Sequence, residues 1–158
     1  MADYPFFPMF VDLSSKVVVV VGAGRIAARR VGVLAQFTPR ITVVAPDVHP
    51  DIEALAARGG VRLLRREYRL TDISGADLVL AATDDSGLNE MICDDCRLRG
   101  IPVNVSSDKA LCDFYFPGIV REGGVVVGVT ASGEGHSRAK KTVEAIRSAL
   151  QRADGRED

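Results

Sequence analysis

The sequence predicts an α/β fold, in which a parallel β-sheet with helices on both faces is followed by an antiparallel hairpin and a final helix. Short β-branched runs alternate with helical patterns over most of the chain, as expected for a parallel sheet. Near the C-terminus a glycine pair separates further strand-like runs, which indicates a hairpin. A chain of 158 residues, 47% of them hydrophobic, is long enough to bury a core.

The sheet is expected to hold five strands. The first, 16–21, is an unbroken run of valines after a lysine that ends at Gly22, and such a run is typical of a strand buried on both faces. The remaining strands are expected at 40–45, 61–64, 77–82 and 101–105. Helical spacing of apolar residues predicts helices at 24–37, 51–58 and 86–99.

The pattern changes after residue 113. Strands at 114–121 and 125–130 flank Glu122-Gly123-Gly124, residues 131–137 form a loop rich in glycine and serine, and 139–152 form a basic amphipathic helix. We therefore expect a domain at 1–113, a hairpin and helix at 114–152, and a frayed tail at 153–158.

A glycine-rich turn joins the first strand to the first helix. Its sequence has the form G-x-G-x-x-A and runs Gly22, Ala23, Gly24, Arg25, Ile26, Ala27. The first glycine permits the tight turn, the second leaves room for a pyrophosphate, and the alanine lets the helix approach the sheet. The N-terminus of the helix would receive the anionic phosphates. This context predicts a Rossmann-type dinucleotide site; the alternative is a Rossmann-like fold that keeps the turn without binding a dinucleotide.

The end of the second strand bears on the choice of dinucleotide. An acidic residue that holds the ribose hydroxyls is expected there, but the strand ends Ala45-Pro46, and Asp47 follows late. Asp47 either takes this role or caps the following helix. Because no arginine stands at this strand end to receive a 2′-phosphate, the sequence favours NAD over NADP.

Further motifs point to one family. They are PMFVDL at 8–13, TVVAP at 42–46, AATDD at 81–85 with Asn89, VNV at 103–105, LCDF at 111–114 and FP at 116–117. Together they extend over about residues 8–145, and the chain resembles the precorrin-2 dehydrogenases that form the N-terminal domains of sirohaem synthases.

The resemblance implies a function and an assembly. The function is oxidation of precorrin-2 to sirohydrochlorin, with hydride transfer to NAD, and some family members also insert ferrous iron. Residues 114–152 would be a dimerisation element of a homodimer. Thr83 and Asp84 would lie beside the cofactor, and Asn104 would face the tetrapyrrole.

The chain departs from the family pattern where an aspartate usually follows the N-V-V motif. Ser107 occupies that position here and Asp108 follows it. A hydroxyl cannot act as a base near neutral pH. Either Asp108 takes the catalytic role through a shifted loop, or the enzyme relies on orienting its substrate and Asp108 is a plain loop residue. This departure weakens the case for iron insertion more than the case for hydride transfer.

The loop at 131–138 also departs from the family, because it lacks the usual Ser-Pro pair. The family's loop serine corresponds to Ser132 or Ser137; we favour Ser137, which could alternatively cap the last helix. His136 beside it could donate a proton or contact the substrate. The basic side chains of the last helix could pair with precorrin carboxylates or simply form a solvated face.

Composition argues against several other classes. The 20 basic and 21 acidic residues give no reason to expect nucleic acid or an anionic membrane as a partner. The longest apolar run is too short to cross a bilayer and the N-terminal residues lack signal-peptide features, so we expect a cytoplasmic protein. Three cysteines suit free thiols. Cys93 and Cys96, three apart on a helix, are expected to pack rather than bind metal, and two histidines do not predict a metal site.

Other functions remain open at this stage. A bifunctional dehydrogenase and sirohydrochlorin ferrochelatase would show iron-dependent turnover. A non-catalytic NAD-binding regulatory domain, like those of ion transport systems, would bind NAD but no tetrapyrrole and would leave the LCDF motif unexplained. A degenerate structural subunit would dimerise without affinity for a cofactor.

Overall fold

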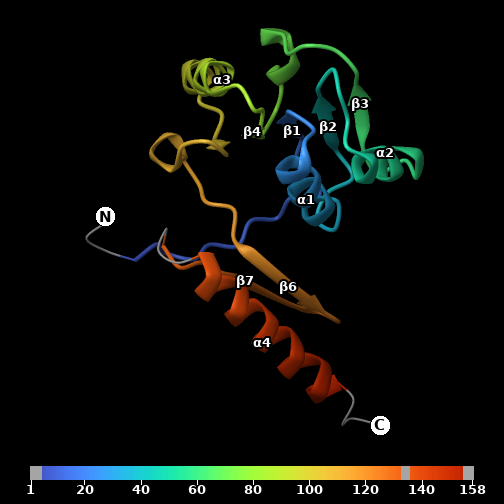
Figure 1. The fold of residues 1–158 in the computed structure, drawn as a ribbon, viewed down its shortest axis with the longest axis vertical. Helices are drawn as coiled ribbons and strands as arrows, with labels where there is room; N and C mark the ends of the chain where they lie inside the picture. The colour runs from blue at the N-terminus through green and yellow to red at the C-terminus, as the bar shows by residue number, and fades with distance from the viewer. Residues whose placement is uncertain (1–4, 133–135, 155–158) are drawn as a thin grey trace. The chain divides into compact units, whose positions relative to one another are not determined.

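The computed structural model describes residues 5–132 and 136–154 (Figure 1). These residues form two compact units. The larger unit spans residues 11–115, and the smaller one combines residues 5–10 with the described residues after 115.

The larger unit contains a five-stranded sheet whose order is β3-β2-β1-β4-β5. All neighbouring strands run parallel, and Val18 of the central strand pairs with Ile41 on one side and Leu78 on the other. The strands are β1 (Val18–Val21), β2 (Ile41–Val44), β3 (Arg62–Leu64), β4 (Leu78–Ala81) and β5 (Val103–Val105). The strand order reverses between β1 and β4, which is where open parallel sheets form a ligand crevice.

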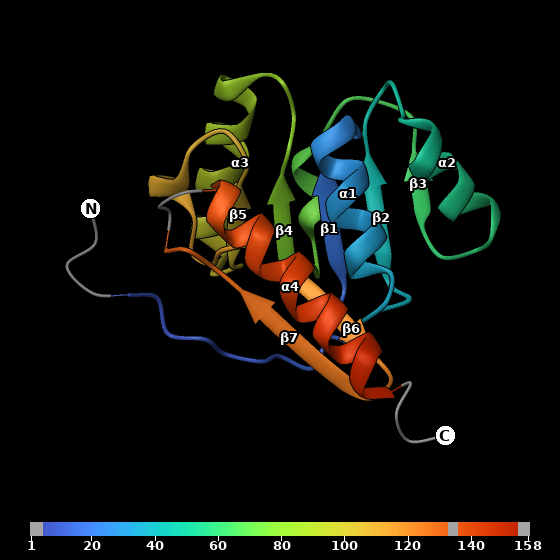
Figure 2. The same cartoon turned by 60° about the horizontal axis from the view of Figure 1, so that its bottom comes forward.

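Helices cover both faces of this sheet, as predicted. The helices α1 (Arg25–Leu34) and α2 (Pro50–Ala57) lie on one face, and α3 (Ser86–Arg99) lies on the other (Figures 1 and 2). Alternate residues of β1 point to opposite faces, so Val19 and Val21 join the core under α3 with Ile92 and Cys96. The expectation that the cysteine pair packs in the core is confirmed, because Cys93 and Cys96 are both buried and free.

Helix α3 has its predicted bounds, and the bounds of the other helices differ from the prediction by one to three residues. Helix α1 ends at Leu34, not at residue 37, because Phe37 N–H bonds back to Leu34 O in a tighter 3₁₀-type turn. Helix α2 is capped by His49, whose Nδ1 accepts the Asp51 N–H at 3.2 Å. The alternative that Asp47 caps this helix was therefore wrong. Two short 3₁₀ helices, η1 (Leu70–Ile73) and η2 (Lys109–Leu111), were not predicted.

The smaller unit holds the predicted hairpin and helix. Strands β6 (Gly118–Glu122) and β7 (Val125–Val129) pair antiparallel, and α4 (His136–Asp154) packs on them. The packing is close, because a Cβ on Gly118 would lie 2.6 Å from Val143 Cγ2. Helix α4 begins before residue 139, so Ser137 lies inside its first turn and cannot be its cap, a correction to that alternative.

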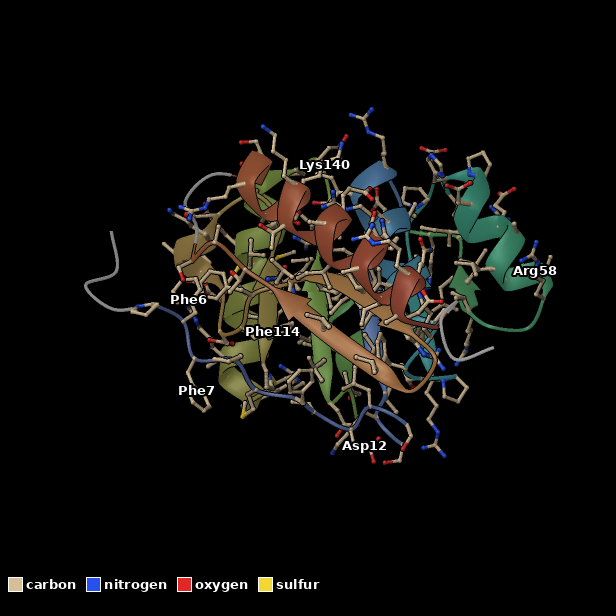
Figure 3. The ribbon with its side chains drawn as sticks, turned by 90° about the horizontal axis from the view of Figure 1, so that it is seen from below. Phe6, Phe7, Asp12, Arg58, Phe114 and Lys140 are labelled. Atoms are coloured by element: carbon tan, nitrogen blue, oxygen red, sulfur yellow. The ribbon has the colours of Figure 1, made fainter. Side chains whose placement is uncertain are left out.

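Residues 5–10 run beside this hairpin unit. The Phe6 N–H donates to Ser132 Oγ at 3.2 Å, while Phe7 is 89% exposed (Figure 3). The Ser132 hydroxyl, the other candidate for the family's loop serine, is thus engaged with the chain itself. Within the described residues, no helix is long and apolar enough to span a bilayer.

Candidate dinucleotide-binding site

The glycine turn leaves β1 at the carboxyl end of the sheet and rests directly on the end of β4. Gly22 has a φ of +98°, and a Cβ there would lie 2.4 Å from Ala82 O and 2.7 Å from Thr83 N. Its N–H donates to Val44 O at 2.9 Å, which ties the turn to β2 as well. Both the backbone conformation and the space therefore require glycine at this position.

The second glycine of the turn faces open space instead. Gly24 is the N-cap of α1, its φ of −77° suits any residue, and a Cβ there would meet nothing within 4 Å. Arg25 and Ile26 beside it are exposed, while Ala23 and Ala27 are buried. The open space lies at the positive end of a helix with unsatisfied N–H groups, so these residues fit an anionic pyrophosphate.

The loop after β2 adjoins the same turn. His49 N–H donates to Ala23 O at 2.9 Å, and Ala45 N–H donates to Leu64 O of β3 at 3.1 Å. Pro46 and Asp47 are exposed. Since His49 caps α2, the Asp47 carboxylate is not the cap. Asp47 follows the end of β2, where an acidic residue binds the ribose hydroxyls in this fold.

A buried amide connects the ends of β4 and β5, and the sequence alone gave it no role. Asn89 of α3 has no exposed surface. Its Oδ1 accepts the Thr83 N–H at 3.1 Å and the Thr83 hydroxyl at 2.8 Å. Its Nδ2 donates to Thr83 O and to Ser107 Oγ, each at 3.1 Å. The signal that could have found it is the spacing from Thr83, which places Asn89 on the first turn of the next helix.

Acidic residues flank this amide on the surface. Asp84 is exposed, and Asp85 caps α3 by accepting the Leu88 N–H at 3.0 Å. At the end of β5, Ser107 and Asp108 are exposed, and Asp108 Oδ1 accepts the Ala110 N–H at 2.8 Å as the cap of η2. The turn residues 22–26, Thr83, Asp84, Ser107 and Asp108 thus follow the carboxyl ends of three neighbouring strands.

Asn104, predicted to face a substrate, is buried on β5. Its Oδ1 accepts a 2.6 Å hydrogen bond from Arg30 Nη1, and its Nδ2 donates to Phe114 O at 2.8 Å. Burial lowers the pKa of Arg30. The amide therefore holds helix α1 and the segment after η2 together, and a direct substrate contact by Asn104 stays a prediction.

Two residues of the LCDF motif form hydrogen bonds with the outer edge of β5. Asp113 Oδ2 accepts the Val103 N–H at 2.9 Å, and the Asp113 N–H donates to Val103 O at 2.9 Å. Cys112 Sγ lies 3.2 Å from both the N and the O of Val105. Burial raises the pKa of the Cys112 thiol. Cys112 and Asp113 therefore bind the edge of β5.

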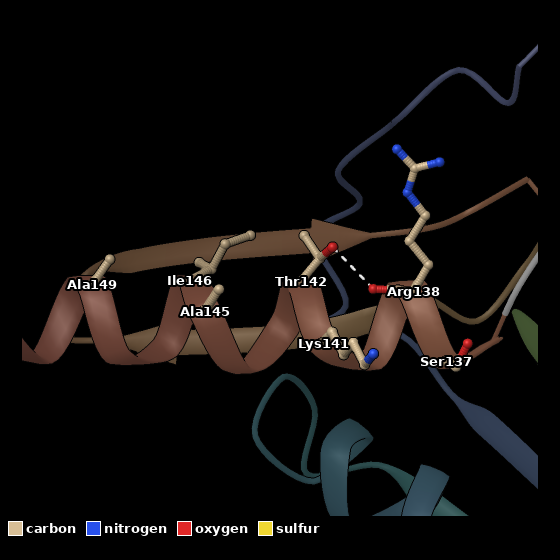
Figure 4. Close-up of a pocket in the computed structure, with 7 residues that line it drawn as sticks. All are labelled: Ser137, Arg138, Lys141, Thr142, Ala145, Ile146 and Ala149. Carbon is tan, nitrogen blue, oxygen red and sulfur yellow. Dashed lines mark hydrogen bonds between the residues drawn. The ribbon is translucent and has the colours of Figure 1, made fainter.

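Ser137 and His136 belong to the hairpin unit. Figure 4 shows Ser137 at one end of a row of residues on α4 that line a pocket and extend past Arg138 and Thr142 to Ala149. The Thr142 hydroxyl donates to Arg138 O at 3.0 Å. His136 opens the helix, but its side chain lies outside the described part of the chain. Among the described residues there is no group of three or more His, Cys, Asp or Glu side chains placed to hold a metal ion.

The doubly wound sheet and the glycine turn at its switch point define a dinucleotide-binding protein of the Rossmann type. Residues 9–118 match the protein family described as "Putative NAD(P)-binding". The chain belongs to that family.

Relatives with established names extend this comparison. The chain is 41% identical over 129 residues to a siroheme synthase of Pseudomonas aeruginosa, covering 82% of this chain and 28% of the relative. It is 34% identical over 151 residues to siroheme synthase 1 of Cronobacter sakazakii, covering 96% of this chain and 32% of that one. The chain thus spans about three tenths of the length of the curated relatives it matches.

A solved structure is similar along nearly the whole chain. The structure of SirC, a precorrin-2 dehydrogenase, superposes with a TM-score of 0.81 at 26% sequence identity. The match covers 91% of this chain and 70% of that one. The matched 91% of the chain contains more residues than the larger unit, 11–115. The similarity therefore extends into the hairpin and terminal helix as well as the sheet.

Proposed function

We propose that this chain is an NAD-dependent dehydrogenase that oxidises precorrin-2 to sirohydrochlorin in sirohaem biosynthesis. The observation that carries the proposal is the glycine turn, in which Gly22 is pressed against the end of β4 while Gly24 opens onto free space at the positive end of α1. The match to a precorrin-2 dehydrogenase and to siroheme synthases supports this substrate.

Each half of the cofactor has candidate residues. The pyrophosphate would be held by the backbone of Gly22, Ala23 and Gly24, with Arg25 adding positive charge and Ile26 an apolar contact. The adenosine ribose would lie at Ala45, Pro46 and Asp47, and because Asp47 is acidic and exposed, we propose NAD rather than NADP. Thr83 and Asp84 would border the crevice. When bound, NAD supplies the ring that accepts the hydride.

The protein's own groups would bind and orient the substrate beside the cofactor. Ser107 and Asp108 follow the end of β5 and would lie on the reaction side of the crevice. One oxygen of Asp108 accepts the Ala110 N–H, and the other is left to take up the proton that the substrate loses.

The hairpin unit would complete the enzyme. We propose that residues 1–113 form the cofactor domain and 114–152 the dimerisation element of a homodimer. His136, Ser137 and the basic side chains of α4 would contact the acidic tetrapyrrole. Asn104 on β5 is likewise proposed as a substrate contact.

An anaerobic assay tests this function. Purified protein is mixed with freshly generated precorrin-2 and NAD, and NADH and the sirohydrochlorin spectrum are followed together. We expect both products to rise in step with the wild-type chain and with Ser74→Ala, an exposed change at the end of η1. NAD binding without turnover would refute the dehydrogenase and favour a nucleotide-sensing role.

A further inference from the structure

Both the oxygen and the nitrogen of the Asn89 side-chain amide form hydrogen bonds inside the candidate site. A side-chain amide offers two donors and two acceptor lone pairs. Its oxygen accepts the Thr83 N–H and shares the single Thr83 hydroxyl hydrogen with Asp85 O. Its nitrogen donates to Thr83 O and to Ser107 Oγ. Because Asn89 is fully buried, its side-chain amide is shielded from competing water.

One side of this network supports the glycine turn. The turn rests on the Ala82–Thr83 peptide, since a Cβ on Gly22 would approach Thr83 N to 2.7 Å. Asn89 bonds the same Thr83 N–H, so it fixes the surface that supports the pyrophosphate turn.

The other side of the network sets the direction of the Ser107 hydroxyl. A hydroxyl has one hydrogen to donate and two lone pairs. Ser107 Oγ accepts from Asn89 Nδ2 at 3.1 Å, and Ser107 is exposed. Its own hydrogen therefore remains to be donated to a ligand on the exposed side.

The place of Ser107 identifies the ligand group. In a doubly wound sheet the adenosine half of a dinucleotide lies toward β2, so the nicotinamide half lies beyond the switch point, over the ends of β4 and β5. Ser107 follows β5 on that side. The nicotinamide carboxamide presents an acceptor oxygen to such a donor.

We propose that Asn89 is a positioning residue that orients the Ser107 hydroxyl to donate to the carboxamide oxygen of the nicotinamide. This inference rests on the proposed NAD binding and adds to it the residues that hold the nicotinamide half.

Two variants and two ligands test it. Asn89→Asp keeps the size of the side chain but replaces Nδ2 by an acceptor, so the Ser107 hydrogen turns inward toward it and the bond to Thr83 O is also lost, while the Thr83 N–H keeps its acceptor. Ser107→Ala removes the hydroxyl and leaves the bonds between Asn89 and Thr83 intact. NADH and ADP-ribose, which lacks the nicotinamide, are titrated into each protein by calorimetry, with Ser74→Ala as the control.

We expect both variants to bind NADH roughly three- to tenfold more weakly, as for loss of one hydrogen bond, and ADP-ribose as the wild type does. The double variant should be no weaker than either single one, because both remove the same bond. If Asn89→Asp does not fold, Ser107→Ala decides alone.

The results that would overturn this inference can be told apart from a failure of the proposed dinucleotide site. Unchanged NADH affinity in Ser107→Ala overturns the inference, as does an equal loss of both ligands in Asn89→Asp with Ser107→Ala unaffected. If the wild-type chain binds neither ligand, the proposed dinucleotide site itself fails and the inference fails with it.

Discussion

The two glycines of the turn should respond in opposite ways to the same substitution. In Gly22→Ala the new Cβ would lie 2.4 Å from Ala82 O, in a backbone conformation with φ of +98°. A left-handed conformation costs a non-glycine residue roughly 1–2 kcal/mol, and relieving an overpacked contact costs about 1–3 kcal/mol more. The expected loss of unfolding free energy is therefore roughly 2–5 kcal/mol. At about 2–4 °C for each kcal/mol, the midpoint should fall by roughly 4–20 °C.

Gly24→Ala should lower the unfolding free energy by only about 1 kcal/mol, the cost of alanine at the N-cap of α1, because its Cβ meets nothing within 4 Å and its φ is −77°. If the pyrophosphate occupies this space, the methyl group displaces it from the helix N–H groups. Hydrogen bonds to a charged group contribute about 1.5–3 kcal/mol, so NADH affinity should fall roughly ten- to hundredfold.

Thermal unfolding by circular dichroism and NADH titration by fluorescence measure both effects on the same protein samples. The reasoning is refuted if Gly24→Ala lowers the midpoint as much as Gly22→Ala does. It is also refuted if Gly24→Ala binds NADH like the wild type, since the open space would then not be the phosphate site.

Three further predictions concern the rest of the larger unit. Ile92→Ala should cost about 2–5 kcal/mol in urea unfolding, because Ile92 is fully buried, whereas the half-exposed Met91→Ala should change stability by less than about 0.5 kcal/mol. The hydrogen bonds from Arg66 lower the pKa of Asp72 below that of an ordinary aspartate, so the pair's stabilisation is complete above the unfolded-state pKa and is lost as the pH falls through the folded-state pKa. Asp72→Asn should accordingly flatten the acid limb of a plot of urea midpoint against pH, and an unchanged limb would contradict this. Asp47→Arg should shift the affinity ratio toward NADP over NAD, and a ratio equal to the wild type's would remove Asp47 from the ribose site.

The parts of the fold that the sequence predicts well are those with local signals. Helix α3 was predicted at its observed bounds, because Asp85 caps its start and Gly100, with a φ of +65°, ends it. The end of α1 carries no such signal, since residues 35–37 can all continue a helix. The start of α2 was predicted one residue late because His49 is an unusual cap.

The candidate site also has a part that local sequence signals predict and a part that they do not. The glycine turn is contiguous in sequence, so its spacing alone predicts its place after β1. Asn89 and Ser107 lie 18 residues apart, and Arg30 and Asn104 lie 74 apart. Which side chains meet at such separations depends on the strand order, because β4 and β5 bring their ends together only once they pair. Periodicity cannot supply that information.

The contacts of Cys112 and Asp113 have a consequence for how far the sheet can extend. Parallel strands use alternate residues on each side, and β5 bonds β4 through Pro102 O and Ser106 N, which leaves Val103 and Val105 facing outward. The side chain and backbone of Asp113 and the sulfur of Cys112 occupy those outward N–H and C=O groups. Because these outward N–H and C=O groups are already bonded, the edge formed by β5 cannot pair with an added strand from the same molecule or from another. The edge is protected without the extra length of chain that a sixth strand would require.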